Sequence, residues 1–286
     1  MRRRMLVWAL AAVFAARVGG EEPSPALAKA RLTDAEQERF LLEGQIVRTK
    51  SAPGGITSST RATLRVDGFE HDAHIQTIDQ AKPVMDVGTG AEVDFRDSYK
   101  NNVAAYRLDR LLGLGMVPVT VVRRYERKEA AYTWWVDDVR MTEGERRAKN
   151  AHSPDIEEWN RQMYVVMVFD QLIYNFDRNP GNLLADGAWR VWMIDHTRAF
   201  KVFKKLNNPK NLRLRCARGL FEALKRLEEP ALRAGMKDLL VPDQTDALLA
   251  RRDLIVRHFE KVLAQKGEAE VLFDLPSRSS ALSARP

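Results

Sequence analysis

Residues 177–200 read DRNPGNLLADGAWRVWMIDHTRAF, the most specific pattern in the chain. The apolar runs 183–184 and 191–194 flank a turn and predict a β-hairpin. Such a hairpin brings Asn182 and Asp195 to the same open end, although they are thirteen positions apart in the chain. We therefore expect two oxygen-bearing side chains to converge there.

A third polar residue, Asp177, lies five positions before Asn182 in a loop of turn-forming residues. Phosphoryl transfer needs a carboxylate that orients the attacking hydroxyl, and a hard divalent metal needs oxygen ligands. Asp177 has the position for the first role, and Asn182 and Asp195 for the second. The structural alternative is a tight turn and a strand end. The loop, the hairpin or the aspartate alone favours the structural alternative, whereas their combination favours a phosphoryl-transfer site.

Length and composition are those of a folded protein large enough for two lobes. The chain has 286 residues, 45% hydrophobic and 30% charged. Its net charge of +7 falls to +3 without residues 1–20, which contain four Arg and no acidic residue. So small a net positive charge excludes a strongly basic nucleic-acid-binding protein.

The N-terminus has the layout of a secretory signal. Three Arg at positions 2–4 precede an apolar run, 5–16, that is too short to span a bilayer. We expect export, to a periplasm or the exterior, without a stable membrane anchor; the alternative is a membrane-anchoring or buried helix. Cys216 is the only cysteine, so no internal disulfide can form, and we expect a buried apolar role for it.

The first half of the chain is expected to be β-rich, with a single long helix at 98–112. Thr33 and Glu36 predict the capped start of a short preceding helix. Asp67-Gly68 predicts a hairpin turn. The expected strands are 45–50, 61–66, 69–78, 117–123 and 132–136.

The second half is expected to be helical. A long helix at 156–176 precedes the loop and hairpin, and further helices over 211–266 are interrupted near Pro230 and Pro242. This order predicts an α+β, bilobal protein-kinase-like fold with a small β-rich N-lobe, a larger helical C-lobe and the nucleotide between them. The expected boundaries are 1–20 for the signal peptide, 21–44 for a linker and short helix, 45–140 for the N-lobe, 141–275 for the C-lobe and 276–286 for a disordered tail.

Two segments carry a family resemblance. Residues 169–184 and 192–200 resemble the atypical kinases of the secretory-pathway kinase and HipA groups and, more distantly, phosphatidylinositol kinases. Residues 101–112 are similar to a helix of the secretory kinases. The resemblance implies ATP and Mg²⁺ or Mn²⁺ as cofactors and a protein or sugar hydroxyl as acceptor. It also implies that Asp177 is the catalytic carboxylate and that the metal ligands are Asn182 and Asp195, with Asn179 where the family usually has His.

The expected phosphate clamp departs from that family. Gln76 stands where the family has a Lys on the third strand, and Asn102 where the following helix has the partner Glu. Losing both charges is electrostatically coherent, because two amides can hydrogen-bond and neither leaves a buried charge alone. Activity is nevertheless in doubt, unless a nearby cation replaces the Lys; the candidates are Lys82, Arg61 and Arg65.

Two further segments are candidate nucleotide contacts. The loop 51–60 is a candidate phosphate cover, although a Gly/Ser hairpin loop without a ligand is as common. Its glycines allow close approach of the backbone, and its hydroxyls add donors. Residues 135–138 occupy the place of an adenine hinge. The candidate nucleotide-binding residues in these segments are Gly54, Gly55, Thr57, Ser58 and Val136.

Three functions remain open from the sequence. The first is an exported kinase-like phosphotransferase. The second is a pseudokinase or nucleotide-binding scaffold, which the Gln76/Asn102 pair favours and the Asp177/Asn182/Asp195 set opposes. The third is an AMP transferase on the same fold. Export to a periplasm, where we expect little free ATP, disfavours simple ATP use.

Overall fold

The computed structural model describes residues 32–51, 59–88 and 90–276. The chain divides into two units, Met1–Leu32 and Thr33–Pro286. The predicted signal peptide (1–20) and all but the first residue of the predicted C-terminal tail (276–286) lie outside the described residues. Within the described ranges, no helix combines the length and apolar character needed to cross a membrane.

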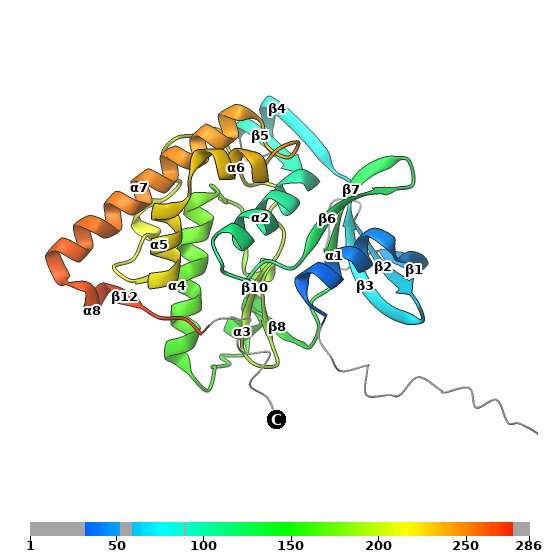
Figure 1. Cartoon of the computed structure of the whole chain (residues 1–286), viewed down its shortest axis with the longest axis horizontal. Coiled ribbons are helices and arrows are strands. Elements are labelled where there is room, and N and C mark those ends of the chain that lie inside the picture. The colour runs from blue at the N-terminus through cyan, green and yellow to red at the C-terminus, as the bar shows by residue number, and fades with distance from the viewer. Residues whose placement is uncertain (1–31, 52–58, 89, 277–286) are drawn as a thin grey trace, which may run out of the picture. The chain divides into compact units, whose positions relative to one another are not determined.

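A five-stranded antiparallel sheet with the order β1-β2-β3-β7-β6 forms the β-rich part (Figure 1). The five strands predicted from the sequence are confirmed, with their ends displaced by a few residues. Their bounds are Gln45–Ser51 (β1), Ser59–Val66 (β2), Phe69–Gln76 (β3), Thr120–Tyr125 (β6) and Lys128–Trp134 (β7).

Turn chemistry and apolar side chains explain the central strands. Asp67 and Gly68 join β2 to β3 with φ values of 47° and 81°, the positive values that a tight two-residue hairpin turn requires. The apolar side chains buried on these two strands are small or branched: Ala62, Leu64, Ala73 and Ile75.

Two helices of the first half begin at the predicted caps. Helix α1 (Asp34–Glu43) has the capping box, in which Glu36 N donates to Thr33 Oγ1 at 3.3 Å and Thr33 N donates to Glu36 Oε2 at 2.7 Å. Helix α2 (Tyr99–Leu111) is capped by Ser98, whose hydroxyl oxygen accepts from Lys100 N at 3.2 Å. Both helices are therefore specified locally.

The hairpin between β3 and α2 is not predicted from the sequence. Strands β4 (Asp79–Asp86) and β5 (Ala91–Ser98) pair as a separate two-stranded antiparallel sheet (Figure 1). Almost every β4 side chain is exposed, so the strand lacks the apolar alternation that marks one buried face. Strand β5 is anchored at its inner end, where Phe95 is buried, and it runs directly into α2.

A small three-stranded sheet, β10-β9-β8, lies within the mainly helical second half. Its strands are Val139–Thr142 (β8), Leu183–Asp186 (β9) and Val191–Met193 (β10). A single 3₁₀ turn, η2 (Pro180–Asn182), leads into β9. The helices are Glu143–Ala148 (α3), Ile156–Leu172 (α4), Arg218–Arg226 (α5), Glu229–Gly235 (α6), Pro242–Lys266 (α7) and Glu268–Val271 (α8).

The ends of three of these helices can be compared with the sequence-based expectation. Pro230 and Pro242 lie in the first turns of α6 and α7, which confirms the predicted interruptions. Helix α4 ends four residues before the predicted end, and Tyr174 just beyond it has a positive φ of 54°. Cys216 is a free, buried thiol in the short strand β11 (Cys216–Ala217), which pairs in parallel with β12 (Leu272–Phe273).

Candidate active site

The hairpin at the candidate site forms where the sequence predicts it. Leu183 on β9 pairs with Met193 on β10, and Ile194 N donates to Asn182 O at 3.1 Å. Asn182 therefore stands opposite Ile194, and Asp195 follows by one residue at the open end. Backbone register therefore places these two residues next to each other at the base of the hairpin.

Asp195 has an unusual backbone conformation at the end of the hairpin. Its φ of 54° lies in the left-handed region, which costs energy for a residue other than glycine. The residue is exposed, and its Oδ1 accepts a hydrogen bond from Thr197 Oγ1 at 3.2 Å. The carboxylate is thus turned towards solvent by a backbone that its neighbours must hold in place.

Two buried amides of α2 hold the segment that follows. Asn102 Oδ1 accepts a hydrogen bond from His196 N at 2.7 Å. Asn101 Nδ2 donates to the carbonyl oxygens of Thr197 at 2.7 Å and Ala199 at 3.0 Å. The residue at the expected Glu position therefore anchors the loop after Asp195, a role that the sequence does not reveal because it depends on contacts across more than 90 residues.

The other candidate nucleotide contacts are only partly described. Gln76 is buried at the end of β3, where it pairs with Ser59 on β2 and Ala131 on β7. Val136 is buried just after β7. The candidate loop residues Gly54, Gly55, Thr57 and Ser58 lie outside the described residues.

Asp177 lies on the exposed loop between α4 and η2. Burial among surrounding protein atoms raises the pKa of its carboxyl group, and the negative charges of Asp195, Asp97 and Glu92 raise it further, whereas Arg198 lowers it. Asp177 therefore lies in an electrostatic cluster with Asp195, and with three charged residues that the sequence does not point to.

Arg178, the next residue, holds the loop to the rest of the second half. Its guanidinium forms a bidentate ion pair with Asp170 of α4, at 3.0 Å from Nε to Oδ2 and from Nη2 to Oδ1. Its Nη1 donates to the carbonyl oxygens of Asn182 at 3.1 Å and Ile194 at 2.7 Å. One side chain therefore ties both arms of the hairpin base to α4.

Asp97, at the end of β5, is a further acidic residue of the cluster. Burial raises the pKa of Asp97, and the charges of Asp195 and Glu92 raise it further. A hydrogen bond from Thr197 and the charge of Arg198 lower it, but by less. Its Oδ1 is enclosed without a hydrogen-bond partner among the described residues. The sequence gives no signal for this residue, because its strand is itself not predicted.

The raised pKa of Asp97 leads to a stability prediction. An acid with a higher pKa in the folded than in the unfolded chain destabilises the fold increasingly as pH rises from the unfolded pKa to the raised one, and fully above it. Asp97→Asn should therefore raise the free energy of unfolding at about pH 8, and this gain should shrink as pH falls towards about 4, the ordinary pKa of an aspartate. Urea unfolding at both pH values measures it; a gain independent of pH, or a loss at pH 8, would contradict the electrostatic explanation.

The oxygen ligands of the site fit a hard divalent cation. Mg²⁺ is typically held by one or two carboxylates together with substrate phosphates and water, which matches the amide of Asn182 and the carboxylate of Asp195. Among the described residues, no three His, Cys, Asp or Glu side chains are arranged to hold a metal by themselves. The carboxylates of Asp97, Asp177 and Glu92 add negative charge nearby, which favours a cation.

Comparison by sequence finds no relative. No family model matches the chain. No curated protein matches it either. The fold, in contrast, has clear structural neighbours.

Three solved structures illustrate the similarity. Hydra Fam20 with sugar has a TM-score of 0.62 and 16% identity, over 84% of this chain and 92% of that one. The Golgi casein kinase with Mn/ADP bound has a TM-score of 0.61 and 14% identity, over 85% and 80% of the two chains. The Helicobacter pylori proinflammatory kinase CtkA has a TM-score of 0.51 and 11% identity, over 79% and 98%.

These identities establish the fold and nothing finer. The chain has an atypical kinase-like fold, with a β-rich N-terminal sheet and a helical C-terminal part. This confirms the predicted fold class and the resemblance to the secretory-pathway kinase-like group.

Proposed function

We propose that this protein is a metal-dependent phosphotransferase that moves the γ-phosphate of ATP to a hydroxyl group of a protein or sugar. One observation carries the proposal: on a kinase-like fold, the β9–β10 register brings Asn182 beside Asp195, in the charged surroundings of Asp177. A catalytic carboxylate with two oxygen ligands is the minimum that phosphoryl transfer asks of a protein.

Each side chain has a distinct role in this proposal. Asp177 accepts a hydrogen bond from the acceptor hydroxyl, orients it towards the γ-phosphate and takes up its proton. Asn182 and Asp195 would hold Mg²⁺ or Mn²⁺, which neutralises phosphate charge when bound. Arg178 keeps the two arms of the hairpin base together, so that the two ligands stay in register.

The structural neighbours support the cofactors and acceptor classes of the proposal. The Golgi casein kinase carries Mn/ADP, and the hydra Fam20 structure contains sugar. We extend these chemistries to this chain as the proposed cofactors and acceptors. We further propose export, on the basic and apolar segment at residues 1–20.

A second candidate function follows from Gln76. A glutamine cannot neutralise phosphate charge, so its burial at the end of β3 favours either a scaffold that binds nucleotide without turnover or transfer of AMP from a re-oriented nucleotide. The kinase transfers the γ-phosphate of ATP, the AMP transferase transfers the α-phosphate with its nucleoside, and the scaffold transfers neither.

One labelling experiment separates the three. The full-length chain is incubated with ATP labelled at either the γ or the α position, with Mg²⁺ or Mn²⁺, and with casein or a panel of free sugars. Metal-dependent incorporation of γ-label, lost in Asp177→Asn and Asp195→Asn, is the expected result. Incorporation of α-label would replace the kinase by an AMP transferase, and nucleotide binding without incorporation would favour the scaffold.

A further inference from the structure

The proposed function lacks one component, a cation for the phosphates. Two of the basic residues considered from the sequence are engaged elsewhere. Arg61 pairs with Asp72 at 2.5 Å and lies over the ring of Trp135, and Arg65 pairs with Glu70. Lys82, the third candidate, is an exposed residue of β4. A more enclosed cation lies closer to Asp177.

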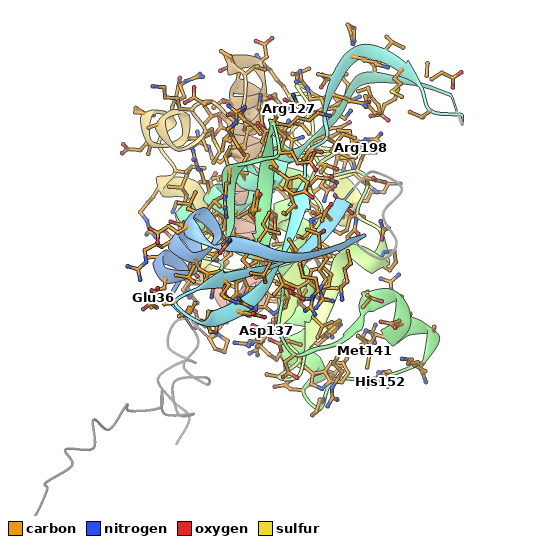
Figure 2. The ribbon with its side chains drawn as sticks, turned by 90° about the vertical axis from the view of Figure 1, so that its right-hand side faces the viewer. Glu36, Arg127, Asp137, Met141, His152 and Arg198 are labelled. Carbon is orange, nitrogen blue, oxygen red and sulfur yellow. The ribbon has the colours of Figure 1, made fainter. Side chains whose placement is uncertain are left out.

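Arg198, three residues after Asp195 and labelled in Figure 2, packs against Phe176, and its charge acts on the neighbouring Asp177. Its guanidinium carbon is 4.6 Å from the ring centre of Phe95 on β5 and 5.4 Å from that of Phe176, the residue before Asp177. The two aromatic contacts fix the position of the guanidinium between the β4–β5 hairpin and the catalytic loop. Its positive charge acts on both Asp177 and Asp97.

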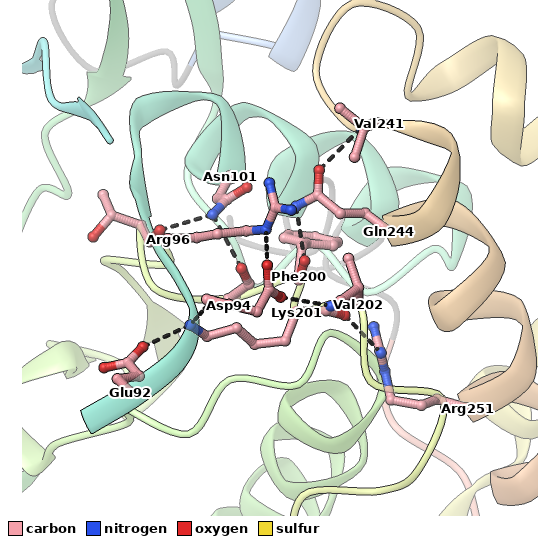
Figure 3. Close-up of polar contacts among 12 residues, drawn as sticks. Glu92, Asp94, Arg96, Asn101, Phe200, Lys201, Val202, Val241, Gln244 and Arg251 are labelled. Carbon is pink, nitrogen blue, oxygen red and sulfur yellow. Dashed lines mark hydrogen bonds and ion pairs between the residues drawn. The ribbon is translucent and has the colours of Figure 1, made fainter. Parts of the chain in front are cut away.

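Glu92 on β5 orients this guanidinium. Its Oε2 accepts a hydrogen bond from Arg198 Nη2, and its Oε1 accepts one from Lys201 Nζ at 2.6 Å. Figure 3 shows Lys201 between Glu92 and Asp94, whose backbone carbonyl takes a second bond from Nζ. Lys201 is 1% exposed and fully engaged, whereas Arg198 retains about a fifth of its side-chain surface, 22%.

The nitrogens of Arg198 differ in what they can reach. Nη2 is bound to Glu92, and Nε is enclosed without a hydrogen-bond partner in the described part of the chain. Nη1 makes no hydrogen bond with any described residue. That N–H group, on a planar and permanently charged side chain, is suited to a phosphate oxygen.

We infer that Arg198 is a phosphate-binding residue of the proposed kinase and supplies, from the loop after Asp195, the positive charge that β3 lacks at Gln76. The inference rests on the proposed function. Because Arg198 packs against Phe176, the neighbour of Asp177, where the hydroxyl is expected to attack, it contacts the terminal phosphates rather than the α-phosphate. Glu92 and the two aromatic rings hold it in place before the nucleotide binds.

Nucleotide affinity tests this role. Affinities of full-length wild-type and Arg198→Met protein for Mg·ATP and for AMP are measured by calorimetry. Loss of one charge-assisted hydrogen bond should weaken Mg·ATP binding about 10- to 100-fold. AMP binding should be unchanged, and Arg198→Lys should recover part of the loss, because a lysine keeps the charge but not the fork of donors.

Arg96→Met is the matched control. Arg96 lies on β5, the strand that carries Glu92, is similarly exposed at 20%, and its substitution removes a similar ion pair, with Asp94. It should bind Mg·ATP as the wild type does. If Arg198→Met weakened the binding of AMP and of Mg·ATP equally, or weakened neither, the inference would be overturned. The proposed function would still stand if the wild-type chain transferred phosphate. A wild-type chain that binds no Mg·ATP would overturn both.

Discussion

Asp177→Asn is expected to lower the rate of phosphate transfer about 10²- to 10⁴-fold, the contribution typical of a positioned general base. Asparagine keeps the shape of the side chain but cannot take up the proton of the acceptor hydroxyl. Nucleotide binding should change little, because the proposed metal ligands, Asn182 and Asp195, remain. The measurement is kcat and KM for ATP with the γ-labelled nucleotide, so that a loss in kcat is separated from a loss in binding.

A suitable control for this substitution is Asp155→Asn. Asp155 caps α4, where its Oδ1 accepts a hydrogen bond from Glu158 N at 2.8 Å, and asparagine caps a helix about as well as aspartate. This variant should keep its transfer rate. Transfer by Asp177→Asn at the wild-type rate would remove Asp177 from the mechanism.

Asp170→Ala is expected to reduce the free energy of unfolding by about 3–5 kcal/mol, the range for breaking a buried ion pair. Asp170 and Arg178 are each 11% exposed at the side chain, so the substitution leaves the Arg178 guanidinium largely buried without its carboxylate. Asn175 also loses a partner, since its Nδ2 donates to Asp170 Oδ1 at 3.1 Å. Urea unfolding of the full-length chain measures the loss.

Glu157→Ala, on the same helix, provides the comparison. Glu157 pairs with Arg161 at 2.9 Å, but their side chains are 61% and 32% exposed. Such a pair contributes less than about 1 kcal/mol. If Asp170→Ala cost no more than Glu157→Ala, Arg178 would not be the clamp that the geometry indicates.

The parts of the site that the sequence predicts are those set by short-range pairing. Asn182 and Asp195 converge because a tight hairpin joins them, and the apolar runs that specify this hairpin are visible in the sequence. The five-stranded sheet is similarly visible, since Asp67-Gly68 and the apolar residues of β2 and β3 are local signals.

The remaining parts depend on contacts between distant segments. Strand β4 is exposed on both faces and so carries no apolar pattern, and without its hairpin neither Glu92 nor Asp97 can be placed near Asp195. The bond between Glu92 and Arg198 spans 106 residues. Asn102 remains a candidate site residue, and its observed bond to His196 N depends on where α2 packs, which its position in the sequence cannot indicate.

Metal-dependent binding of nucleotide is the most direct test of the central claim, that Asn182 and Asp195 form a metal–nucleotide site beside Asp177. Calorimetric titration of the full-length chain with ADP is performed with and without Mn²⁺, on wild type and Asp195→Asn. Binding should require Mn²⁺ in the wild type and should be weakened at least about 10-fold in the variant, because one charged ligand contact is lost. Binding that is equally strong without Mn²⁺, or unchanged in Asp195→Asn, would contradict it.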